Sequence, residues 1–144
     1  MTWTSEQIRA AKDLARVMKE KGVRWEWEQW DFFISLRENR IKVVLTPAEA
    51  DHLCSTFVQE AIPLPTFERC LEVLEKWGWR FGYLDCPGQT SSVINPYELC
   101  VRTPGPRSAE EANEVKEEFI RTTGPDPTTC AIKAVEEVVR RKGE

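Results

Sequence analysis

One structural pattern occurs twice in this chain. An apolar helical stretch runs into a glycine and then into alternating aromatic residues, first around Gly22 and again around Gly78. Glycine ends helices by adopting left-handed backbone, and alternation of this kind is typical of a strand with one buried face. The repeat therefore predicts two helix–glycine–strand units. Its matched positions are Gly22 with Gly78, Arg24 with Arg80, Trp25 with Phe81 and Trp27 with Tyr83.

Apolar periodicity along the rest of the chain predicts an α+β fold with antiparallel strands flanked by helices. The expected order is α-βββ-α-α-ββ(β)-α-α, either as one extended sheet or as two small sheets. We expect a single domain, 1–144, with possible sub-units 1–62 and 63–144. Helices are expected over 5–21, 47–57, 66–77, 108–121 and 127–142, strands over 23–27, 31–36, 41–45, 79–83, 93–94 and 99–101, and an extended connector over 62–65.

Composition restricts the functional classes. The net charge of −4 argues against a general phosphate-binding surface and against nucleic acid as a partner, but it allows a local basic pocket. The chain has neither a signal-peptide pattern nor an apolar stretch long enough to cross a membrane. With one histidine, His52, and no CxxC pair, we expect no metal site, no cofactor and a cytoplasmic location.

The aromatic residues divide into two groups. Alternation places Trp25, Trp27, Trp79, Phe81 and Tyr83 on buried sheet faces, beneath the helices. Two other tryptophans fall outside the alternation and are the better candidates for an exposed stacking or partner surface; they are Trp30 and Trp77.

Three arginines suggest an anion site. Arg24 and Arg80 hold equivalent places in the repeat, and with Arg102 they could present planar guanidinium groups to a phosphate or carboxylate. In the alternative interpretation Arg24 and Arg80 are exposed strand residues that pair with Glu26 and Glu28. Exposed ion pairs of this kind contribute little to stability.

A polar loop over 85–92 offers a second group of anion-binding candidates. Its backbone N–H groups and small polar side chains could cradle a phosphate, although the Gly-Lys-Ser/Thr of a P-loop is absent. The alternative is an ordinary hairpin connection. The candidate ligand-binding side chains in this loop are Gln89, Thr90, Ser91 and Ser92.

Groups that could support catalysis are few. His52 and Cys54 lie two apart on a predicted helix, so they do not face each other. A thiol enzyme would use Cys54 or Cys86 as nucleophile, and the alternative is that these are structural residues. The glutamate-rich stretch 110–118 could mimic a nucleic-acid backbone, or it could be an ordinary solvated helix face.

From about Thr66 onward, over roughly half its length, the chain resembles small phage and prophage proteins with an α-β-α sandwich domain. The stretches that carry the resemblance are Glu72–Phe81 and Pro127–Ala134. Here an additional acidic stretch precedes the closing helix, and the first 60-odd residues have no counterpart in that family. The resemblance implies a phage context and a layered fold, but it supplies no functional residues.

Three functions follow as hypotheses. The first is a non-catalytic, phage-associated binding protein that sequesters a small anionic, nucleotide-like ligand or blocks a component of host defence, in the host cytoplasm. The second is a protein-interaction module, either a homo-oligomer or a binder of a host or phage protein, with no small ligand. The third is a thiol-dependent hydrolase.

Overall fold

The computed structural model describes residues 2–55, 61–86, 96–104 and 117–142. In these ranges the chain forms four helices and two three-stranded antiparallel sheets, which confirms the α+β class. In chain order the elements are α1 (Ser5–Lys21), β1 (Phe32–Ser35), β2 (Arg40–Val43), α2 (Pro47–Ser55), β3 (Ala61–Pro63), α3 (Phe67–Lys76), β4 (Arg80–Asp85), β5 (Tyr97–Arg102), β6 (Phe119–Gly124) and α4 (Pro127–Arg141).

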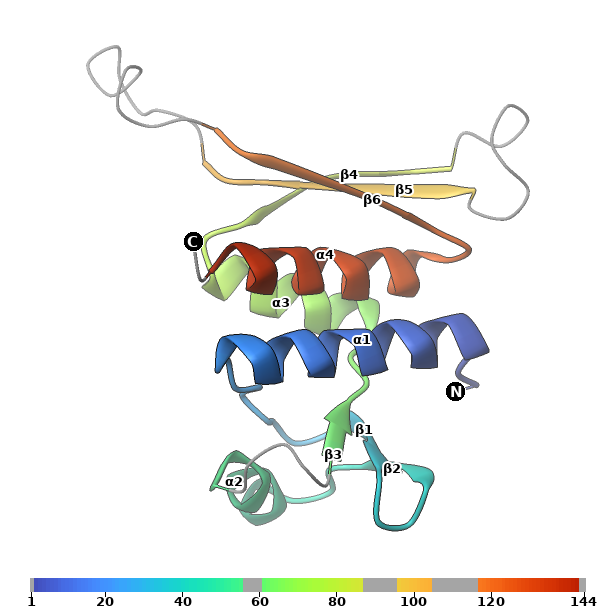
Figure 1. Cartoon of the computed structure of the whole chain (residues 1–144), viewed down its shortest axis with the longest axis vertical. Coiled ribbons are helices and arrows are strands. Elements are labelled where there is room, and N and C mark those ends of the chain that lie inside the picture. The colour runs from blue at the N-terminus through green and yellow to red at the C-terminus, as the bar shows by residue number, and fades with distance from the viewer. Residues whose placement is uncertain (1, 56–60, 87–95, 105–116, 143–144) are drawn as a thin grey trace.

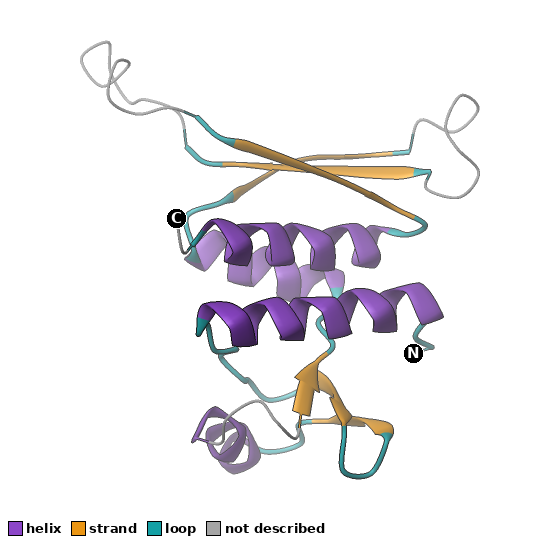
Figure 2. Ribbon diagram, in the orientation of Figure 1, coloured by secondary structure: helices purple, strands orange, loops and turns teal. Residues whose placement is uncertain are grey.

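Helices α1, α3 and α4 separate the two sheets (Figure 1). The β4–β5–β6 sheet packs on α3 and α4, and the β2–β1–β3 sheet lies on the far side of α1. Helix α1 runs along α4, so elements from opposite ends of the chain lie side by side (Figure 2). Of the two arrangements expected from the sequence, the structure therefore has two small sheets.

The main core lies among these helices and the inner face of the β4–β5–β6 sheet. Leu14 of α1, Leu74 of α3, Leu99 of β5 and Val135 of α4 are all fully buried there. Each comes from an apolar stripe at helical spacing or from an alternating strand, so the sequence pattern alone places them inside.

The repeated helix ends are confirmed. Thr4 followed three residues later by Gln7 predicts a capping box at the start of the first helix, and the structure confirms it. Gln7 N–H donates to Thr4 Oγ1, and Thr4 N–H donates to Gln7 Oε1. Gly22 (φ 68°) and Gly78 (φ 89°) follow α1 and α3 in left-handed backbone.

The strands expected over 31–36 and 41–45 predict a hairpin with Asn39 in its turn, and the structure confirms both and adds a third strand. Phe32 pairs with Val43 and Ser35 with Arg40, and the turn between them holds Asn39 at φ 53°. The connector expected over 62–65 is extended, but its first part also pairs with β1 as β3.

The strand predicted over 23–27 is wrong. This segment belongs to no sheet and runs as an extended connection between α1 and the small sheet. One reason is that its backbone is engaged by a side chain, because the Glu26 carbonyl accepts a hydrogen bond from Arg69 Nη2. Side-chain anchoring replaces a neighbouring strand, and alternation alone could not distinguish the two.

The helix predicted over 108–121 is wrong at its end. Residues 119–121 belong to β6, which pairs with β5 from Arg102↔Phe119 to Tyr97↔Gly124. The same residues also alternate in exposure, with Ile120 buried and Phe119 and Arg121 exposed. This period-two pattern fits a strand, and the segment forms one because β5 lies beside it with free backbone hydrogen-bonding groups. The rest of this prediction over 105–116, and the strand predicted at 93–94, lie outside the described residues.

Candidate functional site

The aromatic stripe divides between the two copies of the repeat. Trp25 (3% exposed), Trp27 (6%) and Trp79 (6%) are buried, as predicted. The prediction is wrong for Phe81 (49% exposed) and Tyr83 (39%). Both belong to β4, which lies at the edge of its sheet. Register places Tyr83 opposite Cys100, on the face away from α3 and α4.

Trp30 and Trp77 lie in separate places. Trp30 is 64% exposed and adopts left-handed backbone (φ 76°), next to the buried Arg69. The Arg69 Nε donates to Asp31 Oδ1 at 2.9 Å, and its guanidinium lies 5.1 Å from the Trp25 ring centroid. The exposed position expected for Trp30 is confirmed, whereas Trp77 is half-buried at the end of α3.

Two of the predicted site residues, Arg24 and Trp77, line one cavity. It has a volume of about 170 Å³ and lies where the chain leaves α1, α3 and α4. Its lining residues are Val23, Arg24, Trp25, Glu26, Val73, Lys76, Trp77 and Lys142. Segments far apart in the sequence thus bring three cationic side chains, one carboxylate and two indole rings together; we call this the basic cavity.

Electrostatics in the basic cavity are dominated by its cations. Lys142 Nζ lies 3.7 Å from the Trp77 ring centroid, a cation–π contact. Partial burial lowers the pKa of Lys142, and the nearby charge of Glu26 opposes that shift. Glu26 in turn holds Lys76, with its Oε2 3.3 Å from Lys76 Nζ. Glu28 is not part of the lining, but its Oε1 also lies 3.6 Å from Lys76 Nζ.

Helix ends give this cluster an ordinary structural role as well. Basic side chains in the last turn of a helix compensate the negative end of its dipole, and Lys76 and Lys142 both stand at such ends. The sequence analysis selected neither lysine as a site residue. The available signal was a lysine beside Trp77 and another just beyond the last helix.

Arg80 and Arg102 lie elsewhere, directly opposite each other on β4 and β5. Arg102 Nη1 lies 3.6 Å from Glu117, and Arg80 has no ion-pair partner within the described ranges. The alternative that the repeat arginines pair with Glu26 and Glu28 finds no support for Arg80, since these acids contact Lys76 and Arg69. The three predicted arginines thus lie in two places.

Gln89, Thr90, Ser91 and Ser92 of the polar loop lie outside the described residues, so their predicted role stays a prediction.

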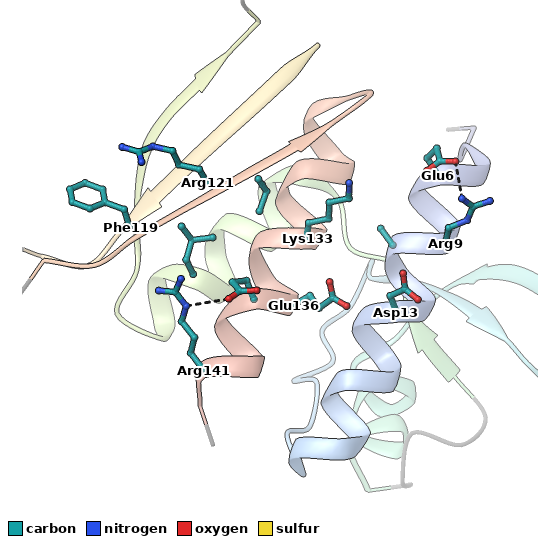
Figure 3. A pocket seen from close by; sticks show the side chains of 12 residues that line it. Glu6, Arg9, Asp13, Phe119, Arg121, Lys133, Glu136 and Arg141 are labelled. Carbon is teal, nitrogen blue, oxygen red and sulfur yellow. Dashed lines mark hydrogen bonds and ion pairs between the residues drawn. The ribbon is translucent and has the colours of Figure 1, made fainter. Parts of the chain in front are cut away.

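A larger groove of about 530 Å³ lies between α1, α4 and β6 (Figure 3). Its charged side chains alternate in sign and partly satisfy one another, as in the ion pairs Glu6–Arg9 (3.5 Å) and Glu137–Arg141 (3.3 Å). Four acidic and four basic side chains line it, so it selects neither sign of charge. They are Glu6, Asp13, Glu136 and Glu137, and Arg9, Arg121, Lys133 and Arg141.

The cysteines show no arrangement for nucleophilic catalysis in the described part of the chain. Burial raises the pKa of the Cys70 thiol and raises that of Cys130 to about 11, which makes both thiols poor nucleophiles near neutral pH. Cys54 and Cys86 are exposed. No group of three or more potential metal ligands occurs among the described residues.

Searches with protein-family models and comparisons with curated proteins and with solved structures found no match to this chain. None of the helices within the described ranges is long and apolar enough to cross a membrane.

Proposed function

We propose that this protein binds a small anionic ligand in the basic cavity and performs no chemistry on it. The observation that carries the proposal is Lys142 Nζ at 3.7 Å from the Trp77 ring, in a cavity shared with Arg24 and Lys76. Cationic side chains outnumber carboxylates in this lining, which favours a bound anion.

The state of Lys142 supports the sign of the ligand. Its pKa is lowered because partial burial removes water from the ammonium group, with only the charge of Glu26 acting in the other direction. A bound anion would supply the missing opposite charge and raise that pKa again. Lys142 should therefore lose its proton at a lower pH than a fully solvated lysine does. Anion affinity should weaken over that lower pH range.

Size limits the ligand. Cavities for drug-sized ligands have volumes of roughly 300–1,000 Å³, whereas this one has about 170 Å³. The cavity suits a phosphate- or carboxylate-sized group, with the remainder of a nucleotide-like molecule outside it.

The test is thermal and chemical unfolding in the presence of inorganic phosphate, inorganic pyrophosphate and a nucleoside monophosphate. A ligand at a hundredfold excess over its dissociation constant should raise the free energy of unfolding by about 2.7 kcal/mol. Removing one charged contact, in Arg24→Gln or Lys142→Gln, should weaken binding about tenfold.

Lys12→Gln, which removes an exposed lysine elsewhere on α1, is the matched control and should bind like the native chain. Absence of stabilisation by every compound, or equal binding by all three variants, would overturn the proposal.

The phage setting extends this proposal. In the host cytoplasm, a binder of this kind could sequester a nucleotide-like signal and so interfere with host defence. That extension depends on the family resemblance, not on the geometry of the basic cavity.

A further inference from the structure

The outer face of the β4–β5–β6 sheet lies outside the basic cavity and carries charged and aromatic side chains to which the proposed function gives no role. Leu99 and Val101 of β5 point into the core, so Glu98, Cys100 and Arg102 point the other way. Helices α3 and α4 cover only the inner face, and no element within the described ranges covers the outer one (Figure 1). Tyr83 and Phe119 are exposed on it, at 39% and 44%.

Like charges oppose each other at both ends of this face. Arg80 pairs with Arg102 at one end, and Asp85 pairs with Glu98 at the other. Directly opposed like charges on neighbouring strands destabilise a sheet. Arg102 is already paired with Glu117 at 3.6 Å, and Glu98 accepts a hydrogen bond from the Tyr83 hydroxyl. Arg80 and Asp85 have no ion-pair partner in the described part of the chain, which suggests that another surface neutralises these two charges.

The two charged rungs are equidistant from the centre. Tyr83 pairs with Cys100 in the middle, with each charged rung two positions away along β5. On β4 the register shift between Phe81 and Tyr83 takes up one extra residue, which brings Arg80 level with Arg102. The face therefore has positive and negative ends at equal distances, roughly 7 Å, from its middle.

We propose that a second copy of this chain docks on the outer face, sheet against sheet, about a two-fold axis that runs across the strands through the Cys100 rung. That operation places each strand over its own counterpart with the direction reversed. Arg80 then faces Asp85 of the second copy, Arg102 faces its Glu98, and the reciprocal contacts repeat both pairs. A two-fold interface requires this kind of self-complementarity.

The acidic end favours a second copy over an anionic partner. A nucleic acid would be attracted to Arg80 and Arg102 but repelled by Asp85 and Glu98 on the same face. In the middle rung the Arg121 guanidinium lies 5.8 Å from the Phe119 ring centroid of its own chain, a cation–π contact.

The face is small. Three strands of six residues cover roughly 14 by 20 Å, well below the roughly 800 Å² that each partner buries in a stable interface. We therefore expect a weak, salt-sensitive dimer that forms at micromolar or higher concentration. This inference is independent of the basic cavity, so either can fail alone.

The test uses charge reversal at Arg80 and Asp85, which have no ion-pair partners in the described part of the chain. In sedimentation at several concentrations, the native chain should show a monomer–dimer equilibrium. Arg80→Asp and Asp85→Arg should each weaken it about tenfold or more, because like charges then meet across the interface. Arg37→Asp and Asp51→Arg, both remote from the sheet, are the matched controls and should leave it unchanged.

Mixing gives the sharpest result. An Arg80→Asp chain and an Asp85→Arg chain should form a heterodimer. The first chain then has acids at both positions of β4, and these face arginines at both positions of β4 in the second chain. The double variant should again form a homodimer. Three results would each overturn the proposal: a native chain that sediments only as monomer, single variants that dimerise normally, or a mixture that stays monomeric. A dimer that none of these changes affects would indicate pairing through a strand edge instead.

Discussion

The first copy of the repeat buries its aromatic rings, and the second copy exposes them. Trp25 and Trp27 follow Gly22 into the core without joining a sheet, whereas Phe81 and Tyr83 follow Gly78 into an edge strand and remain exposed. Both copies have a glycine, an arginine two residues later and the same alternating aromatic positions. The difference comes from what lies next to each segment, which is the side chain of Arg69 in one case and the backbone of β5 in the other.

The largest expected effect is a difference in stability loss when matched aromatic residues of the two copies are replaced by alanine. Trp25→Ala should lower the free energy of unfolding by about 4 kcal/mol, because it leaves a cavity and removes the indole donor to Asp31. Phe81→Ala should cost about 1 kcal/mol, because that ring is half exposed. Urea unfolding measures both, and equal losses would refute the contrast.

Next is the anchor of the first copy. Arg69→Met should cost about 3 kcal/mol, since Asp31 is buried and would lose its cationic partner. Arg80→Met, the same change at an exposed arginine of β4, should alter the free energy of unfolding by less than about 0.5 kcal/mol. Adding Asp31→Leu to Arg69→Met should recover part of the loss, and a double variant less stable than the single one would argue against a buried ion-pair role.

At the glycines the two copies should behave alike. An added Cβ at Gly22 or Gly78 meets nothing within 4 Å, so alanine there costs only the strain of left-handed backbone. We expect losses of about 1–2 kcal/mol at both positions, measured by chemical denaturation, with smaller losses for asparagine. A loss at one glycine only would show that the two helix ends are not equivalent.

The smallest expected effect is a pH dependence of the free energy of unfolding. Its source is a buried cysteine that only the helix of the second copy has. Cys70 occupies the place of Leu14, and burial raises its pKa, as it raises that of Cys130 to about 11. A thiol whose pKa is higher in the folded state stabilises the fold below its unfolded pKa, and this stabilisation is lost as pH rises.

The free energy of unfolding should therefore fall as pH rises from about 9 to 11, and Cys70→Val should reduce the fall. Thiol labelling at neutral pH provides a second measurement, in which Cys54 and Cys86 react in the folded protein and the three buried cysteines react only after unfolding. An unchanged slope in Cys70→Val would show that this thiol does not titrate with unfolding.

Sequence patterns predicted the features that depend on local interactions. The capping box at Thr4, the glycine helix ends, the hairpin turn at Asn39 and the start of α4 at Asp126 each need only neighbouring residues, and all are present. The candidate site was predicted in part. Arg24 and Trp77 do line one cavity, but Lys76 and Lys142 join them through the meeting of three helix ends, which no local pattern encodes.

By itself the sequence determined where helices begin and end and which of their faces are apolar, because capping, backbone freedom and periodicity act over a few residues. Only the tertiary structure decided whether an alternating segment would become a strand, as at Phe119–Gly124, or an anchored extended connection, as at 23–27. An extended segment forms its hydrogen bonds with distant parts of the chain. Its fate therefore depends on which backbone or side chain the packing of α1, α3 and α4 brings beside it.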